Sequence, residues 1–454
     1  MNAISFNIRG RIYNWLEEIL RERFNLELQI IEINDGISLL LKNADLSIKL
    51  PKMNTDFFNE KSTVTCGEWN TSKENWDSIL DKPIPTPGMS KLPFPLIKHK
   101  KGMYIIKYDI MGLLYWTLSR QEEVTSVIVD SHNRFPASAS HAYKHNYLER
   151  PIVDEWLHIL GQVIKKQWPH VELKKHKFQL RISHDVDIPS QYGFSSGKKL
   201  LKSIAQNTIR YHDYGSFLFA PWIRLNTRTY LHPKDPFNTF NWIMDNSEKN
   251  NLTSAFYILC GGSKTEKHAD YSLDHPAIRT LLRHIHERGH EIGLHPDYNT
   301  YKSPEKIINA AQQLKQVCSE ERIVQSEWGG RMHYLQWEHP TTLLAWESAG
   351  MSYDSTLGYA DQPGFRCGSC FEYPAFDPVS KKRLNLRLRP LIVMESTIIA
   401  KHYLNLGYSK ESLSTFKKFK NTCKQVGGQF TLLWHNSHLT KKEGRDFYQK
   451  LIAS

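Results

Sequence analysis

The most constraining feature of the sequence is a repeated alternation of short apolar segments and helical segments between residues 174 and 454. Seven segments have the apolar or alternating pattern that is typical of β-strands. They are residues 179–182, 254–259, 291–294, 323–326, 351–355, 390–394 and 429–434. Amphipathic helical stretches separate most of them, and two of these begin at Pro276 and Pro304. This alternation predicts a parallel α/β architecture, either an open sheet or a closed barrel.

Residues 1–165 lack this alternation and predict a separate, smaller α+β domain. Helical spacing of apolar residues occurs in three segments, residues 8–23, 108–120 and 151–167. Residues 26–50 alternate in part and predict strands on either side of a turn at Asn34-Asp35-Gly36. No group of catalytic or metal-binding residue types stands out in this part. We therefore expect two domains, residues 1–165 and residues 174–454.

The composition is that of a globular chain with a basic surface. Forty per cent of the 454 residues are apolar, and lysine and arginine exceed aspartate and glutamate by 59 − 47 = 12. A basic surface favours anionic partners, but no nucleic-acid-binding motif accompanies the charge, so we expect no nucleic-acid partner. The N-terminus lacks a signal-peptide pattern, and no apolar run approaches the length of a membrane span. Together with six widely spaced cysteines, these features predict a cytoplasmic protein with reduced thiols.

Ionisable residues gather where the first predicted strand of the second domain ends. The strand at residues 179–182 leads into His184, Asp185 and Asp187. In an extended segment, residues i and i+2 face the same side, so the two carboxylates project together. Because they repel each other, they need a cation or a shared proton. A divalent metal meets that need, with one aspartate as ligand and the other free to act as a base. The alternative is a polar loop that caps the following helix.

Four other predicted strands also end in polar residues. In parallel barrels the carboxyl ends of the strands share one face, where catalytic residues collect. The residues concerned are His295 and Asp297 after the third strand, Arg331 and His333 after the fourth, Asp354 at the end of the fifth, and His435 and His438 after the seventh. Histidine together with carboxylate suits a divalent metal such as zinc, with manganese, cobalt or iron as alternatives. The sequence therefore predicts a metal-dependent site at this face.

On these residues, the segment 174–454 resembles the polysaccharide deacetylases of the NodB-homology type, carbohydrate esterase family 4. Ser183-His184-Asp185-Val186-Asp187 is similar to the first motif of that family, and the stretch from Gly289 to His295 is similar to the second. The resemblance implies a distorted (β/α)7-type barrel that binds a divalent metal. It also implies Asp185 as the catalytic base, Asp187 and His295 as metal ligands, Arg331 as the residue that steadies the base, and His435 as the general acid.

The chain departs from the family pattern at the remaining metal ligand. The second motif of the family has another metal-binding histidine four residues after the first, where this chain has Asn299. An asparagine carbonyl is a poorer zinc ligand than an imidazole. His333, two residues after Arg331, is our candidate for this position. Asn299, His435 and water are the alternatives.

The resemblance implies a metal-dependent hydrolase that removes N- or O-acetyl groups from a glycan or glycan precursor in bacterial surface-polysaccharide synthesis. The N-terminal domain looks like the extra domain of a subgroup associated with that synthesis. A carbohydrate, including anionic and lipid-linked forms, is then the expected substrate. One alternative is a related barrel hydrolase that cleaves another C–N bond or a glycosidic bond, with Asp185 paired with Asp354 or Asp297. Another is a non-catalytic glycan-binding or assembly protein.

Overall fold

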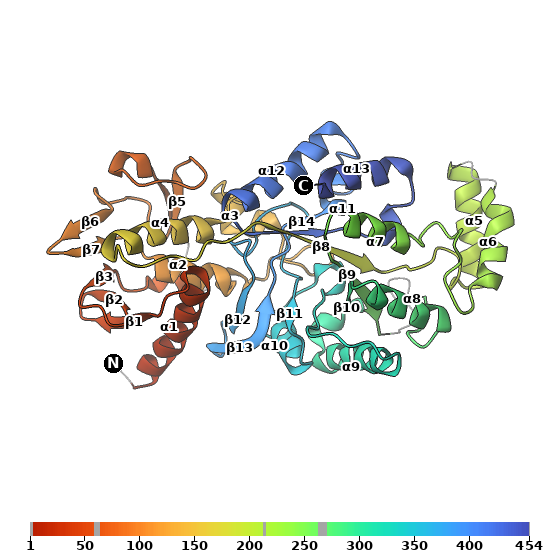
Figure 1. Cartoon of the computed structure of the whole chain (residues 1–454), viewed down its shortest axis with the longest axis horizontal. Coiled ribbons are helices and arrows are strands. Elements are labelled where there is room, and N and C mark those ends of the chain that lie inside the picture. The colour runs from red at the N-terminus through yellow and green to blue at the C-terminus, as the bar shows by residue number, and fades with distance from the viewer. Residues whose placement is uncertain (1–2, 59–63, 212–214, 262–269, 454) are drawn as a thin grey trace.

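The computed structural model describes residues 3–58, 64–211, 215–261 and 270–453. The protein is a mixed α/β molecule with two five-stranded sheets, one in the N-terminal third and one in the remainder of the chain. Figure 1 shows an elongated molecule with the N-terminal sheet at one end and helices α5 (Gly197–Tyr211) and α6 (Gly215–Asn226) at the other. Within the described ranges, no helix is both long enough and apolar enough to span a membrane.

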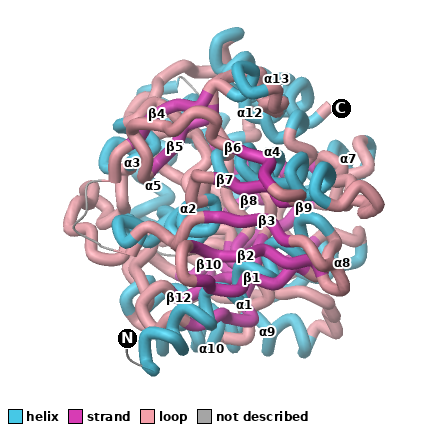
Figure 2. Tube along the Cα trace, turned by 90° about the vertical axis from the view of Figure 1, so that its left-hand side faces the viewer, coloured by secondary structure: helices cyan, strands magenta, loops and turns pink. Residues whose placement is uncertain are grey.

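The N-terminal sheet has the strand order β1-β2-β3-β7-β6, and its strands face the viewer in Figure 2. The strands are β1 (Leu28–Ile33), β2 (Gly36–Leu41), β3 (Ser47–Leu50), β6 (Ile97–Lys100) and β7 (Met103–Ile106). β1 and β2 form an antiparallel hairpin in which Ile33 pairs with Gly36, which confirms the predicted turn. A side chain at Gly36 would collide with the Leu50 carbonyl oxygen, 2.3 Å from the Cβ position. Glycine is therefore required at this point of the hairpin.

Three predicted helices pack on the N-terminal sheet. They are α1 (Ala3–Phe24), α2 (Ile110–Leu118) and α4 (Ile152–Gln167). Their apolar faces are buried, including Trp15, Leu114 and Trp156, as expected of helices whose apolar residues recur at helical spacing. A two-stranded sheet and a short helix complete this part, namely β4 (Cys66–Trp69), β5 (Ile84–Pro87) and α3 (His141–Lys144).

The second sheet is parallel throughout and has the order β10-β9-β8-β15-β14. Its strands are β8 (Gln179–Val186), β9 (Ser254–Cys260), β10 (Glu291–Pro296), β14 (Val393–Met394) and β15 (Gln429–Leu433). β9 is buried along its whole length, as expected of an interior strand of a parallel sheet covered on both faces. Because the strands run in one direction, their carboxyl ends lie along a single edge of the sheet.

Helices cover this sheet. They are α7 (Phe240–Lys249), α8 (Pro276–Glu287), α9 (Pro304–Glu320), α10 (Thr341–Ser348), α11 (Glu395–Ile399), α12 (Lys410–Gln425) and α13 (Lys442–Ile452). In Figure 1, α12 and α13 lie above the sheet, and α8 and α9 lie below it. α8 and α9 begin at Pro276 and Pro304, as predicted. Proline suits the first helical position because the missing N–H has no intrahelical acceptor there.

Two parts of the strand prediction were wrong. Residues 323–326 form no strand, and the next backbone contact with β10 is a bridge between Leu294 and Gly330. The approach is too close for a side chain, since a Cβ at Gly330 would lie 2.0 Å from the Leu294 carbonyl oxygen. The structure also contains a hairpin that was not predicted, formed by β12 (Tyr373–Asp377) and β13 (Lys382–Leu388). Its strand β13 pairs with β11 (Tyr353–Asp354). Pro374 lies inside β12, and proline within a run argues against a strand.

The described strands do not form a closed barrel, because they fall into separate sheets. Backbone hydrogen bonds beyond the strand pairings nevertheless continue from β10 through residues 329–330 to β11, and from there to β15. The bonds run from Leu294 N to Gly329 O (2.9 Å), from Ser355 N to Gly330 O (2.8 Å), from Arg389 N to Asp354 O (2.8 Å) and from Ile392 N to Thr431 O (3.2 Å). The prediction of a mixed α/β fold is thus confirmed, while closure into a barrel stays a prediction.

A buried ion-pair network joins the N-terminal third to the remainder of the chain. Glu123 lies between two guanidinium groups, 2.7 Å from Arg120 Nη2 and 2.7 Å from Arg366 Nη2. Burial alone would raise the pKa of Glu123, but Arg366 and Arg120 hold it well below its usual value. Removing one partner of such a buried pair leaves an uncompensated charge, which costs about 3–5 kcal/mol. The network therefore opposes separation of the two parts.

Candidate metal centre

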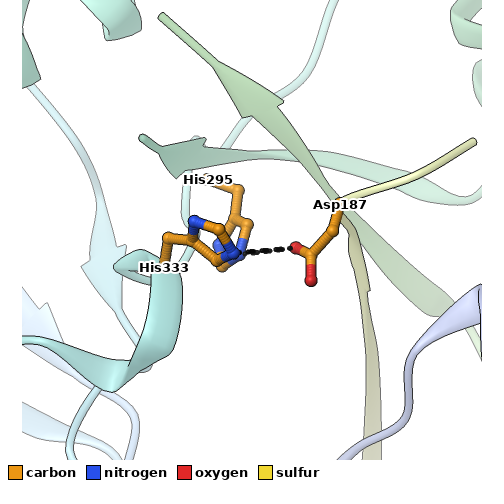
Figure 3. A group of neighbouring side chains, drawn as sticks. All are labelled: Asp187, His295 and His333. Atoms are coloured by element: carbon orange, nitrogen blue, oxygen red, sulfur yellow. Dashed lines mark ion pairs between the residues drawn. The ribbon is translucent and has the colours of Figure 1, made fainter. Parts of the chain in front are cut away.

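Three side chains from separate segments meet at the carboxyl edge of the second sheet. Asp187 follows the last residue of β8, His295 lies within β10, and His333 lies in the turn His333–Leu335. We call these residues the Asp–His–His cluster. Their ligand atoms all lie within 4.8 Å of one another, and Figure 3 shows both imidazoles pointing toward the carboxylate. The structure thus brings together the three residues that the sequence analysis named as metal ligands.

The atoms that face the centre of the cluster are short of partners. His295 Nε2 lies 3.1 Å from Asp187 Oδ1, and His333 Nε2 lies 3.6 Å from the same oxygen. Asp187 Oδ1 and His295 Nε2 are buried and have no hydrogen-bond partner among the described residues. Unpartnered buried polar atoms are rare and costly, and each one needs an explanation. A cation between these atoms would satisfy both of them.

A neighbouring carbonyl holds His295 in the tautomer that metal binding requires. His295 Nδ1 lies 2.7 Å from the carbonyl oxygen of Arg331. A carbonyl oxygen only accepts hydrogen bonds, so Nδ1 carries a proton, and in neutral imidazole Nε2 presents a lone pair to Asp187. Proteins commonly orient metal-binding histidines in this way. Two imidazole nitrogens and one carboxylate oxygen also match the ligands of three-ligand catalytic zinc sites.

The electrostatics of the cluster favour positive charge at its centre. Burial alone would raise the pKa of Asp187, but His333, His295 and His435 hold it well below its usual value. Burial lowers the pKa of His295, but the carboxylates of Asp185 and Asp187 raise it overall. These carboxylates stabilise either a proton on His295 or a metal ion in its place.

The predicted base, Asp185, is fixed by a buried arginine. Arg331 is fully buried, and its Nη1 donates a hydrogen bond to Asp185 Oδ1 over 2.7 Å. The remaining guanidinium donors bond to Ser183 Oγ (2.9 Å), Ser355 O (2.9 Å) and Ser355 Oγ (3.1 Å). The other carboxylate oxygen, Asp185 Oδ2, lies 3.8 Å from His295 Nε2. Asp185 therefore uses one oxygen for Arg331 and presents the other to the cluster.

The predicted acid, His435, is held by a carboxylate that the sequence analysis did not identify. Glu395 Oε1 accepts hydrogen bonds from His435 N (3.0 Å), from His435 Nδ1 (2.5 Å) and from His438 Nδ1 (2.8 Å). Burial lowers the pKa of His435, but Glu395 and then Asp187 raise it to about 10. His435 Nε2 points toward the cluster, 3.7 Å from Asp187 Oδ2. We call Glu395, His435 and His438 the Glu–His–His cluster.

Asn299, the alternative third ligand, lies outside the Asp–His–His cluster. It is exposed and has a left-handed backbone conformation with φ of 63°. Its N–H donates to Gln336 Oε1 (2.9 Å), and its Oδ1 accepts from Gln336 Nε2 (3.3 Å). The side chain therefore helps to fix the loop that follows His333.

The N-terminal third also reaches the site, which the sequence analysis did not anticipate. The carbonyl oxygen of His132 accepts a hydrogen bond from Gln336 Nε2 (2.8 Å), and Arg134 Nη1 donates to the carbonyl oxygen of Tyr334 (3.1 Å). These contacts support the turn that carries His333. No local pattern could have indicated them, since the partners are 204 and 200 residues apart in the chain.

Comparison with known proteins gives few similarities. Residues 3–169 match a family of unknown function, DUF7033, and no curated protein matches the chain. The structure is similar to one from Mycobacterium smegmatis that is provisionally assigned as a polysaccharide deacetylase. That similarity has 13% sequence identity and a TM-score of 0.39 and covers 62% of this chain and 84% of that chain. The structure is also similar to that of Puue allantoinase, with 10% sequence identity and a TM-score of 0.37. The match covers 71% of this chain and 91% of the allantoinase chain. Similarity at this level indicates neither a reaction nor a substrate.

Proposed function

We propose that this chain is a metal-dependent hydrolase that removes acetyl groups from a glycan, and that its second sheet belongs to a strongly distorted (β/α)7-type barrel. The observation that carries the proposal is the position of Asp185. Its carboxylate is paired with buried Arg331 on one side and approaches to 3.8 Å from His295 Nε2 on the other. A proton acceptor beside an unsatisfied Asp–His–His cluster is the arrangement that metal-assisted hydrolysis requires.

Each residue of the site has a role in this proposal. The Asp–His–His cluster holds one divalent ion, and its two imidazole nitrogens favour zinc, with manganese, cobalt or iron as alternatives. Such an ion lowers the pKa of water and polarises an acyl carbonyl. Asp185 accepts the proton from the water whose oxygen bonds to the acyl carbon. The bond between that carbon and the sugar nitrogen or oxygen then breaks, and His435 donates a proton to the leaving group. The products are acetate and a free amino or hydroxyl sugar.

The surroundings of Asp354 favour deacetylation over glycosidic cleavage. Glycosidic cleavage requires a second carboxyl group that flanks the scissile bond. Asp354 is buried, and Thr356 donates to both of its oxygens, from N to Oδ1 over 2.9 Å and from Oγ1 to Oδ2 over 2.6 Å. It is therefore engaged in fixing the turn after β11 and is poorly suited to act on a sugar.

The substrate we propose is an acetylated glycan or glycan precursor, including anionic and lipid-linked forms, in bacterial surface-polysaccharide synthesis. The excess of twelve basic over acidic residues suits an anionic glycan. The buried network around Glu123 and the contact between Arg134 and Tyr334 hold the N-terminal third against the part of the chain that carries the proposed active site.

Acetate release tests the proposal directly. The full chain, loaded with Zn²⁺, is incubated with N-acetylglucosamine oligomers and with an O-acetylated polysaccharide, and free acetate is measured. We expect acetate from one of the two substrates, and a loss of roughly a hundredfold or more in the Asp185→Asn variant, which keeps the proposed metal ligands. Absence of acetate from both, in protein that contains metal and binds the glycan, would favour a non-catalytic glycan-binding protein.

A further inference from the structure

Helices α5 and α6 form a hairpin that stands apart from the main body. It is inserted between β8 and α7 and lies at the end of the molecule away from the N-terminal sheet (Figure 1). A small core of its own holds it together, separate from the main core. The buried residues of this core are Tyr192, Leu200, Ile204, Ala220 and Ile223. We call residues 197–211 and 215–226 the α5–α6 hairpin.

The outward side of α6 is apolar. The exposed side chains, with their exposed fractions, are Phe217 (67%), Leu218 (73%), Phe219 (47%), Trp222 (45%) and Leu225 (66%). Leu201 and Ile209 of α5 and Tyr230 just beyond α6 are also exposed. A surface helix of a globular protein normally presents polar residues to water. An exposed group of large apolar side chains of this kind marks an interaction site.

Basic residues accompany this apolar surface. The stretch from Pro189 to Lys234 contains Lys198, Lys199, Lys202, Arg210, Arg224, Arg228 and Lys234 but a single acidic residue, Asp213. Lys198, Lys202, Arg228 and Lys234 are exposed. Lys234 Nζ lies 5.4 Å from the ring centre of Phe219 and 5.8 Å from that of Trp222. Positive charge therefore lies on the hairpin itself, at Lys198 and Lys202, and beside its exposed aromatic rings, at Lys234.

The charge of the hairpin decides which partner fits it. A second copy of the chain would bring two basic hairpins together, and like charges oppose that contact. An anionic lipid surface accepts both features at once. Phe, Leu and Trp enter the boundary between headgroups and acyl chains, while Lys and Arg remain at the negatively charged headgroups. We propose that the α5–α6 hairpin docks on the surface of an anionic lipid bilayer. The proposal depends only on the exposed residues of the hairpin and is independent of the reaction proposed above.

Vesicle flotation with the full chain tests this inference. We expect the protein to float with vesicles of equimolar phosphatidylglycerol and phosphatidylcholine, and to bind vesicles of phosphatidylcholine alone at least about tenfold more weakly. The triple variant Phe217→Ser, Phe219→Ser, Trp222→Ser should lose at least about tenfold of the binding to the anionic vesicles. A Lys198→Glu, Lys202→Glu variant should weaken binding to the anionic vesicles and leave binding to neutral vesicles unchanged.

A matched control separates the hairpin from apolar exposure in general. Phe94 and Val324 are 77% and 81% exposed and lie elsewhere in the chain, so the double variant Phe94→Ser, Val324→Ser should bind like the wild type. Circular dichroism establishes that each variant is folded. The inference is overturned if the folded wild type floats with neither kind of vesicle, or if the folded triple variant floats like the wild type. Dimers in sedimentation velocity that the triple variant abolishes, without vesicle binding, would assign the surface to a second copy.

Discussion

Two clusters of one carboxylate and two histidines lie at the same edge of the sheet, and they differ in how the imidazoles meet the carboxylate. In the Glu–His–His cluster, Glu395 Oε1 accepts three hydrogen bonds from His435 and His438, at 2.5 to 3.0 Å. In the Asp–His–His cluster, Asp187 Oδ1 faces two imidazole nitrogens at 3.1 and 3.6 Å and accepts no hydrogen bond from any described residue. Glu395 Oε1 thus already holds both imidazoles of its cluster, although Glu395 Oε2 is buried without a partner among the described residues. In the second cluster the atoms that face each other, Asp187 Oδ1 and His295 Nε2, both lack a partner among the described residues, and a cation between them would satisfy both.

This difference separates two roles for the same residue types. A carboxylate that accepts a proton-bearing Nδ1 fixes the orientation of the imidazole and raises its pKa, which suits a proton donor. A carboxylate that faces two Nε2 atoms, with no proton between them, can bind a metal ion together with both imidazoles. Residue type alone cannot distinguish the two cases, because the assignment depends on which imidazole nitrogen faces the carboxylate.

The largest effect should follow removal of a ligand from the Asp–His–His cluster. We expect His295→Ala to lose bound metal and to lose hydrolytic activity by roughly a thousandfold or more, since metal assistance contributes several kcal/mol. His438→Ala is the matched control, because it removes an imidazole from the other cluster and should retain metal. Elemental analysis and acetate release measure the two quantities. Equal metal loss in both variants would remove the distinction between the clusters.

A smaller loss of hydrolytic activity is expected when Asp185, the proposed base, is replaced by an uncharged residue. Asp185→Asn should reduce activity by roughly a hundredfold or more, because water would attack without a positioned proton acceptor. Its metal content should equal that of the wild type, since Asp185 uses one oxygen for Arg331 and lies outside the ligand set. A variant that lost metal together with activity would make Asp185 a ligand instead of a base.

The Glu–His–His cluster should act through orientation of His435. We expect Glu395→Gln to reduce activity by about tenfold to a hundredfold, as for the removal of other orienting partners, while the metal remains bound. His435 is then free to turn away from the substrate. Activity measured on metal-loaded protein tests this expectation. Activity equal to that of the wild type would contradict a role for Glu395.

The same variant should change the dependence of stability on pH. Burial would raise the pKa of Glu395, but His435 and His438 hold it below its ordinary value of 4.5. A carboxyl group whose pKa is lowered by folding stabilises the native state above pH 4.5, and this contribution is lost as the pH falls. The free energy of unfolding should therefore fall more steeply with acid in the wild type than in Glu395→Gln. Denaturant unfolding of both proteins across this pH range measures the contribution of Glu395 to the free energy of unfolding. A chelator in the buffer removes the contribution of bound metal.

The smallest effect is expected at Asn299. The substitution Asn299→Gly removes the side chain and keeps the left-handed φ of 63° accessible. Metal content should be unchanged, and the free energy of unfolding should change by only about 0.5 kcal/mol. Loss of metal in this variant would restore Asn299 as a ligand in place of His333.

Much of this site could be predicted because parallel strands align their carboxyl ends. Asp185 and His295 lie near the carboxyl ends of β8 and β10, and Asp187 and His435 follow β8 and β15. The apolar pattern identified all three strands, so the proximity of these residues followed from the fold class. Glu395 was missed although it directly follows β14, where the same rule applies. Its function depends on an imidazole 40 residues away, and no local spacing encodes that contact.

The parts that could not be predicted depend on tertiary contacts. Residues 323–326 are apolar enough for a strand, but the glycines at 329 and 330 allow a closer approach to β10, and the chain pairs there instead. That shift sets the position of His333, which the sequence left as one of several candidates. The contacts of Arg134 and His132 with the same turn cross from the N-terminal third and leave no periodic signal.

Metal content of the purified chain tests the central claim most directly. Elemental analysis of the wild type should find about one divalent ion per chain, as expected for a single three-ligand site. The ion should be absent from His333→Ala and present in Glu395→Gln and Asn299→Gly. A wild type without metal after loading with Zn²⁺, Mn²⁺, Co²⁺ and Fe²⁺ would contradict the account, as would a His333→Ala variant that retains its full content.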